Sequence, residues 1–426
     1  MSAAQQLQLP DLTIPLRDTS TLRRVLTQYW QRVLQEFLRL PQAKIKLENR
    51  PLYVETARLL EQLARADLRT ALQIVRQPTI STLVQIILPQ LQADGDQAAL
   101  NRWLREACVL VLLELAVRGG LPAEGVQVGR GKDGSFAVLR CPDAQLQVEL
   151  LPAATTVLFL PKQLRIGPGD WQVALDDPTS VAANDAPFSL THPYHEIVAG
   201  LFLAETDNNP LSDFEAHPDK SGNQLNLGGH SVQQWVDELR ADLLLIDKHL
   251  PLVGQEIRLT MKLIIPVGYD AEKHLSASYE EAIGLLYMTL HPNRMTMTEA
   301  LIHEFQHNKI NAAFRIDPLL SNAWRPLYTS PVRPDPRPLH GVVLAVHAFQ
   351  PVAKLYEIMT ENGDDLSRNA YFKQRFHQIL QINRRGATTV LDHAKPTAVG
   401  GPFFAEMRAI EDHFAVYAQQ NWPDES

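Results

Sequence analysis

The chain has 426 residues, of which 45% are hydrophobic and 21% are charged, and this length allows two or three domains. These proportions are typical of a globular protein and exclude a mostly disordered chain or a fibre. With 40 Lys and Arg against 48 Asp and Glu, the net charge is −8, which disfavours binding to a nucleic-acid backbone.

Cysteine content and hydropathy predict the compartment. The two cysteines, Cys108 and Cys141, cannot form a disulfide framework and suit a reducing environment. The first residues contain no basic residue followed by an apolar run, so they lack the pattern of a secretory signal. The longest strongly apolar stretch, Ala107–Val117, contains Glu114 and is far shorter than the ~20 residues that span a bilayer. We therefore expect a cytoplasmic protein that contacts no membrane.

The first third of the chain has a helical pattern. Apolar residues recur at spacings of three and four, which is typical of helices with one buried face. Prolines at positions 41, 51, 78 and 89 fall between these stripes, where helix breakers are expected. The pattern predicts a helical domain over residues 1–120, with helices at Leu22–Leu38, Tyr53–Ala66, Leu68–Arg76, Thr79–Leu88 and Ala98–Val117.

From about Val126 the pattern changes to short segments rich in Val, Leu and Phe, bounded by Gly, Pro, Asp and Asn. We expect a β-rich domain over residues 121–255, with strands at Phe136–Arg140, Gln145–Leu150, Thr156–Leu160 and Trp171–Leu175. A polar loop over 207–229 interrupts this domain and is long enough to be functional. A helix at Ser231–His249 follows it.

The last part, residues 256–426, is predicted to be a mainly helical catalytic domain. Two strand candidates, Ile257–Pro266 and Ala282–Leu290, lead into the segment TMTEALIHEFQHNKINAAF, which carries the pattern H-E-x-x-H. The expected fold class is α+β: an N-terminal helical bundle, a β-rich middle section, and a C-terminal metal-binding domain with a zincin-like HExxH helix.

The spacing within the motif carries the chemistry. Thr296 followed by Glu299 predicts a capping box at the start of the helix, and no Pro or Gly occurs from residue 297 to 317. Residues four apart lie on one face of a helix, so His303 and His307 can direct ring nitrogens at one metal ion. Glu304 lies one residue further round, where it can contact a metal-bound water.

A third metal ligand is required, and three residues remain open for it. Ile310 and Ala313 exclude the extended metalloprotease motif, which needs Gly and His at those positions. In another class of zinc peptidase the third ligand is a Glu on a following helix, and in this chain the residue available for that role is Glu357. The alternatives are His340, expected at a helix start beside Pro338, and His347 two turns further on the same face. We favour His340.

Three arginines lie in the proline-rich stretch between His307 and His340. Arg325, Arg333 and Arg337 occur in WRPLYTSPVRPDPRPLHG. Their guanidinium groups can bind a carboxylate through two parallel hydrogen bonds. The alternative is that they are solvated or pair with acidic neighbours such as Asp335.

Three stretches, SASYEEAIGLLYMTL, TEALIHEFQHNKINA and RPDPRPLHGVVLAVHAF, resemble the HEXXH-motif peptide-modification proteins, which are encoded beside precursors of ribosomally synthesised, modified peptides. The similarity covers about 80 residues, from Ser276 to Leu355. It implies an oxygenase dependent on Fe(II) and 2-oxoglutarate that hydroxylates a side-chain β-carbon of a precursor peptide. His303 and His307 match the family's histidines, and Asp335–Gly341 matches its second landmark, which makes His340 the third ligand by position.

The chemistry of the residues is compatible with this interpretation. Iron held on one face by three protein ligands keeps positions open for a 2-oxo acid and for dioxygen, whereas zinc in a peptidase needs one open position. With His340 the ligand set would be three histidines rather than two histidines and a carboxylate. Arg337 is the expected contact of the 2-oxoglutarate carboxylate. A zinc metallopeptidase with Glu304 as the base, and a non-catalytic peptide-binding protein with a structural metal, remain as alternatives.

Overall fold

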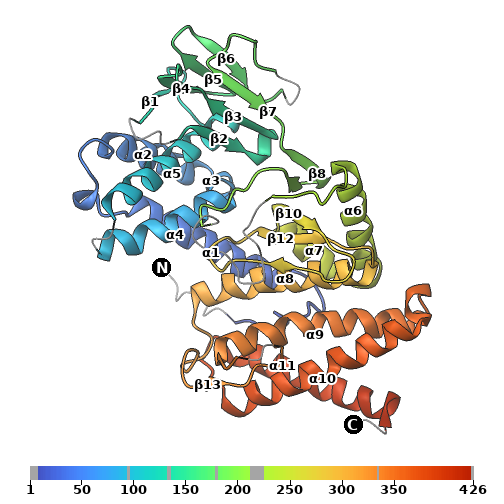
Figure 1. The fold of residues 1–426 in the computed structure, drawn as a ribbon. Coiled ribbons are helices and arrows are strands. Elements are labelled where there is room, and N and C mark those ends of the chain that lie inside the picture. Colours follow the sequence, from blue (N-terminus) through green and yellow to red (C-terminus); the bar gives the residue numbers. More distant parts are fainter. Residues whose placement is uncertain are drawn as a thin grey trace.

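The computed structural model describes residues 8–93, 96–131, 136–177, 181–211, 225–332 and 335–423. The order of elements follows the expected α+β class: helices first, a β-rich middle, and a mostly helical C-terminal part (Figure 1). The polar loop predicted over 207–229 lies largely outside the described residues, because 212–224 are among those left out.

The N-terminal part consists of helices that share one apolar core. They are α1 (Ser20–Leu38), α2 (Arg50–Ala66), α3 (Leu68–Val75), α4 (Pro78–Ala93) and α5 (Gln97–Val117), with a short 3-10 helix η1 (Gln42–Lys44). Pro89 was expected to break a helix, but it lies inside α4. Ile87 and Leu91, on either side of it, are fully buried, so burial of the apolar face beyond the proline outweighs the lost backbone hydrogen bond.

The middle part contains two antiparallel sheets. One has the order β2 (Val138–Cys141), β3 (Leu146–Leu150), β7 (Phe188–Thr191), with η2 (Pro142–Ala144) joining its first two strands. The other has the order β1 (Val126–Gly129), β4 (Thr156–Leu160), β5 (Gln163–Gly167), β6 (Trp171–Ala174). The four strands predicted here are confirmed, with ends shifted by up to two residues. The sequence pattern missed β1, β5 and β7.

A third, five-stranded sheet combines strands from both sides of residue 255. Its order is β11 (Ser276–Ala277), β12 (Leu285–Leu290), β10 (Leu263–Tyr269), β9 (Leu201–Ala204), β8 (Tyr194–Val198). The three central strands are parallel, and the strands at both edges are antiparallel to their neighbours. The helices α6 (Val232–His249) and α7 (Pro251–Thr260) connect β9 to β10.

The strand predicted at Ile257–Pro266 is correct only in its second half. Residues 257–260 belong to α7 rather than to the strand proposed for Ile257–Pro266. Pro251 occupies the first turn of α7 and favours a helix start, and the helix then continues to Thr260 because Val253 and Ile257 are buried along one face. The predicted helix at Ser231–His249 is confirmed, with Ser231 as the N-cap of a complete capping box.

The C-terminal part stacks helices beneath this sheet. They are α8 (Arg294–Ile316), α9 (Leu339–Glu361), α10 (Ala370–His393) and α11 (Gly401–Asn421), with η3 (Asp365–Arg368) before α10 and a small hairpin of β13 (Leu327–Tyr328) and β14 (Arg337–Pro338). Figure 1 shows α8 between the five-stranded sheet and the other three helices. α9 is long and apolar enough to cross a membrane, but 78% of the relevant stretch is buried within the protein.

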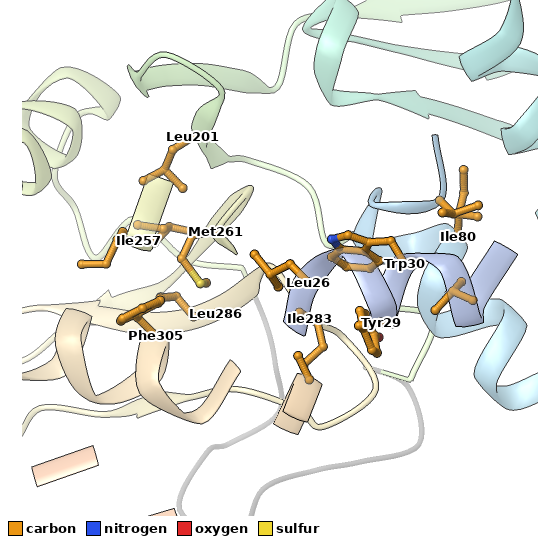
Figure 2. Packing of buried hydrophobic residues seen from close by; sticks show 14 of the residues in the cluster. Leu26, Tyr29, Trp30, Ile80, Leu201, Ile257, Met261, Ile283, Leu286 and Phe305 are labelled. Atoms are coloured by element: carbon orange, nitrogen blue, oxygen red, sulfur yellow. The ribbon is translucent and has the colours of Figure 1, made fainter. Parts of the chain in front are cut away.

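The N-terminal helices pack directly on the sheet and on α8. Figure 2 shows Leu26, Tyr29 and Trp30 of α1 in the same apolar cluster as Leu286 of β12 and Phe305 of α8. The segment before α1 reaches further. The backbone N–H groups of Thr13 and Ile14 donate to the Glu406 carboxylate of α11, and Gln306 of α8 donates to the Thr13 carbonyl at 3.1 Å.

Candidate metal site

The helix that carries the motif begins one turn earlier than predicted. Asn293 is the N-cap of α8, and its side chain accepts hydrogen bonds from the backbone N–H groups of Met295 and Thr296. The expected capping box of Thr296 and Glu299 is therefore wrong. Glu299 lies inside the helix and accepts hydrogen bonds from the Tyr356 hydroxyl and from Arg375 instead.

His303 and His307 meet on one face of α8, as their spacing predicts. Their Nε2 atoms lie 2.9 Å apart, and the ring planes are nearly perpendicular at 88°. Burial lowers the pKa of both imidazoles below the ordinary value, which favours the neutral form that binds metals. In this structure the two Nε2 atoms form a hydrogen bond with each other, and a bound metal ion would replace the shared proton. The Nδ1 atom of His307 is buried without a hydrogen-bond partner.

The distance between the two nitrogens can be tested against a shared metal ion. If each Nε2 lies about 2.1 Å from one point, a separation of 2.9 Å gives an angle of about 90° at that point. Two nitrogens therefore fit one ion. Within the described part of the chain, however, no three His, Cys, Asp or Glu side chains gather as a ligand set, so the two-histidine pair is what the structure places together.

The carboxylate of Glu304 is directed to the edge strand of the sheet. Its two oxygens accept 2.7 Å hydrogen bonds from the hydroxyls of Ser276 and Ser278, and the side chain is almost fully buried. The two serines are separated by one residue in and after β11, so their side chains lie on the same face. Both carboxylate oxygens of Glu304 thus have donors from the protein.

His340 stands at the first turn of α9, next to a cavity. Its backbone N–H donates to the Ala323 carbonyl, and its ring stacks on Trp324 with centroids 4.7 Å apart and packs against Phe314 at 4.5 Å. Burial, together with the nearby His307, lowers the pKa of His340 to about 4. A cavity of about 370 Å³ adjoins these rings. The polar side chains among its lining residues are Gln85, Glu280, Glu281, Asn311, Arg315 and His340.

The two other residues considered for the third ligand have different surroundings. Glu357 is buried, and its carboxylate is occupied by Lys354 at 2.7 Å and by His413 at 2.5 Å. His347 is fully buried, packs against Phe403, and has no hydrogen-bond partner on either ring nitrogen. Glu357 is thus taken up by its own ion pairs, whereas both His347 and His340 lie near enough to His307 for its charge to add to the burial that lowers their pKa. Of these two histidines, His340 lines the cavity.

The predicted carboxylate-binding arginines lie in or beside the β13–β14 hairpin. Arg337 is partly exposed and pairs with Asp335, with 2.9 Å between Nε and the carboxylate oxygen. Although the distance is short, Nε makes no well-directed hydrogen bond there, so the contact is an ion pair only. Arg325 is exposed. Arg333 lies outside the described residues.

The structure adds residues near the histidines that the sequence pattern did not indicate. Arg375 of α10 binds Glu299 at 2.7 Å and lies near enough to His303 to lower its pKa further. Asn311 and Arg315 continue the histidine face at further steps of four residues, and both line the cavity. Oδ1 of Asn311 and Nε of Arg315 are buried without partners. The four-residue spacing from His307 was the available signal for these two, while nothing local indicated Arg375.

Comparison with other proteins adds no assignment. No protein-family model matches the chain, and no curated protein matches it in sequence. The chemistry of the site therefore rests on its own residues: two neutral imidazoles facing one point, a carboxylate held by two hydroxyls, and a cavity with polar and aromatic walls one helical turn away.

Proposed function

We propose that the protein is an oxygenase dependent on Fe(II) and 2-oxoglutarate that hydroxylates a side-chain β-carbon of a ribosomally made precursor peptide. The observation that carries the proposal is the pair of neutral imidazoles of His303 and His307, with 2.9 Å between their Nε2 atoms. Two such groups on one helix would supply two ligands to a metal ion.

Imidazole ligands bind both iron and zinc, so the histidine pair alone does not choose between the two metals. The choice of Fe(II) in this proposal comes from the resemblance of the motif-bearing stretches to the peptide-modification proteins. Bound Fe(II), together with 2-oxoglutarate and oxygen, would supply the oxidising chemistry. His340 is the proposed third ligand, because it is the alternative that adjoins the cavity.

The surroundings of Glu304 distinguish an oxygenase from a peptidase. A peptidase base must take a proton from a metal-bound water, so its carboxylate needs to face that water. In this chain both carboxylate oxygens of Glu304 already accept hydrogen bonds from the hydroxyls of Ser276 and Ser278. This arrangement favours a role in positioning: Glu304 ties α8 to the sheet edge and thereby fixes the orientation of the histidines on either side.

The cavity beside His340 is the proposed place for the peptide side chain. Its volume of about 370 Å³ is within the range of sites for small ligands. Its lining carries the carboxylates of Glu280 and Glu281, while the cation Arg315 already pairs with Glu36 at 3.1 Å. This balance disfavours a dicarboxylate in the cavity and suits a neutral or basic part of a peptide.

The carboxylate of 2-oxoglutarate must then bind elsewhere near the metal. Arg337, Arg333 and Arg325 remain the proposed residues, with Arg337 first, because its ion pair with Asp335 is exposed and therefore weak. Removing one charged hydrogen-bonding fork should raise the 2-oxoglutarate concentration needed for turnover roughly 10- to 150-fold, which corresponds to about 1.5–3 kcal/mol. Arg375, close to His303, is the next residue to test.

The proposal is tested by anaerobic reconstitution with Fe(II), followed by 2-oxoglutarate, oxygen and a peptide encoded beside the gene. We expect succinate to form in step with a peptide that has gained one oxygen atom, measured by mass spectrometry. Peptide cleavage that needs zinc and no 2-oxoglutarate would instead support the metallopeptidase alternative. A bound metal without any turnover would favour the non-catalytic peptide-binding protein.

A further inference from the structure

A second polar cavity, of about 210 Å³, lies away from the histidine pair. It is formed where the end of α3, the end of α5, η2 and the connection from α7 to β10 meet. Four cationic side chains line it, against the single carboxylate of Asp143; these cations are Arg76, Arg118, Arg258 and Lys262. The N-terminal helices, the β-rich middle and the five-stranded sheet all contribute to its walls.

Three of the four cations are neutralised by carboxylates. Arg118 pairs with Glu114 and, at 2.5 Å, with Asp143, and Lys262 binds the other oxygen of Asp143. The Asp143 carboxylate also accepts a 3.0 Å hydrogen bond from the Gln77 amide, so both of its oxygens already have donors from the protein. Arg258 binds the carboxylate of Asp247 with 2.8 Å between Nη1 and Oδ1.

Arg76 is the exception. Among the described residues it forms no ion pair with a carboxylate, and its one hydrogen bond, from Nη2 to the backbone carbonyl of Arg258, is long at 3.3 Å. Its Nε is buried without a partner, and burial lowers the pKa of the guanidinium. The carboxylate whose charge acts on this guanidinium is that of Asp143, which is already bound by Arg118 and Lys262. Arg76 therefore has no carboxylate of its own, and the cavity wall carries an excess of positive charge.

A neighbouring amide indicates where that group would lie. Gln77 follows Arg76 directly, is 5% exposed, and has its Oε1 buried without a donor. The amide N–H of Gln77 donates to Asp143, and Gln77 lines the cavity, so a ligand bound there can supply the donor that its oxygen lacks. An oxyanion that carries a hydroxyl next to its charge satisfies both residues: its charge faces Arg76 and its O–H faces Gln77.

We infer that this cavity is a binding site for a small oxyanion, a phosphate or a carboxylate with an adjacent hydroxyl group. A volume of about 210 Å³ equals roughly seven water molecules at about 30 Å³ each, so there is room for a small organic body besides the charged group. Guanidinium forks are suited to phosphate and carboxylate through paired hydrogen bonds. The bound anion would connect three parts of the fold and stabilise them by mass action.

The experiment measures anion binding to the full chain by calorimetry and thermal unfolding. The probes are inorganic phosphate and citrate, each compared with sodium chloride at equal ionic strength. We expect one of the two oxyanions to bind at one site per chain and to raise the unfolding temperature with concentration. The two probes distinguish a phosphate site from a carboxylate site. Equal shifts with oxyanion and chloride would overturn the inference.

Arg76→Gln tests the residue directly, with Arg69→Gln, an exposed arginine on the same helix, as the matched control. We expect Arg76→Gln to weaken oxyanion binding at least tenfold, and to be no less stable than the parent chain in oxyanion-free buffer, because a half-buried cation without a carboxylate of its own is removed. A purely structural arginine would give the opposite stability change. Gln73→Glu, which adds a negative charge to the cavity wall, should also abolish binding; unchanged affinity in both variants would exclude the site.

Discussion

The carboxylate of Glu304 accepts a 2.7 Å hydrogen bond from the hydroxyl of Ser276, at the edge strand of the five-stranded sheet. Since Ser278 binds the other oxygen, the middle of the HExxH motif is tied to the sheet while its two histidines face each other. If Glu304 positions the helix in this way, Glu304→Gln should keep bound metal and measurable hydroxylation. A glutamine retains one acceptor oxygen for a serine hydroxyl.

The control for Glu304 is the double variant Ser276→Ala with Ser278→Ala, which leaves the carboxylate buried without donors. We expect this variant to lose more stability than Glu304→Gln, because an unpaired buried carboxylate is less favourable than a missing one. Denaturant unfolding measures the difference. Complete loss of turnover in Glu304→Gln with metal still bound would assign the base role of a peptidase to Glu304.

His303→Ala and His307→Ala should each abolish stoichiometric metal binding, because each removes one of the two facing nitrogens. The helix should stay folded, since Asn293 caps it and its apolar face is buried. Elemental analysis after anaerobic loading gives the result, with His377→Ala on α10 as the control. Full iron or zinc occupancy in either variant would show that the metal is bound elsewhere and would overturn the assignment of this pair as ligands.

The third ligand is tested by comparing three alanine variants. His340→Ala should weaken metal binding far more than His347→Ala or Glu357→Ala, because only His340 borders the cavity. Glu357→Ala should instead lower stability, as it removes the buried carboxylate that binds Lys354 and His413. Greater loss of metal in Glu357→Ala would favour the zinc-peptidase ligand set, and loss in His347→Ala alone would place the ligand two turns further along α9.

The stability of the protein should depend on the protonation of Glu406. Burial raises the pKa of this carboxyl to about 7, above the roughly 4.3 of an unfolded glutamate. The native state therefore binds more protons than the unfolded state between about pH 4.3 and 7, and the contribution is lost as the pH rises through that window.

Glu406→Gln should flatten the pH dependence of unfolding over this window, measured with a denaturant from pH 5 to 8. The exposed Glu61→Gln on α2 is the control. Asp242 and Glu411 also have a pKa raised to about 7, so some dependence should persist in the variant. An identical profile in Glu406→Gln and the parent chain would show that Glu406 does not contribute to the pH dependence.

Gly386 allows the close approach of α9 and α10. A Cβ at this position would lie 2.6 Å from Val346 Cγ2 and 3.1 Å from Pro331 Cγ. Gly386→Ala should therefore destabilise by about 1–3 kcal/mol through overpacking, less roughly 1 kcal/mol from the better helix propensity of alanine. Gly341→Ala, whose Cβ would meet Arg337 only at ordinary contact distance, should be neutral or stabilising. Equal unfolding midpoints for both variants would contradict this packing account.

Features set by local sequence were predictable. The long amphipathic helices α1, α2 and α5 and the capped α6 follow from periodicity and cap residues, and the meeting of His303 and His307 follows from their spacing of four on a helix. Pro89 and residues 257–260 were mispredicted because burial of neighbouring apolar residues decided their conformation, and burial depends on distant parts of the chain.

Features that join distant segments were not predictable from the pattern. Arg375 reaches Glu299 across 76 residues, and the pairing of β9 with β10 joins strands separated by two helices. The local sequence around these residues does not indicate either contact. The roles of His303, His307 and His340 as metal ligands and of Arg325, Arg333 and Arg337 as carboxylate-binding residues, together with the domain limits at 120 and 255, stay predictions.

The contact between Thr13 and Glu406 joins residues 393 positions apart, and Gln306 of α8 holds the same short segment. During synthesis the segment around Thr13 leaves the ribosome long before α11 exists, so the backbone N–H groups of Thr13 and Ile14 gain their carboxylate partner only after Glu406 has been made. The segment that Gln306 of the HExxH helix holds is therefore fixed from both sides only after α11 has been made.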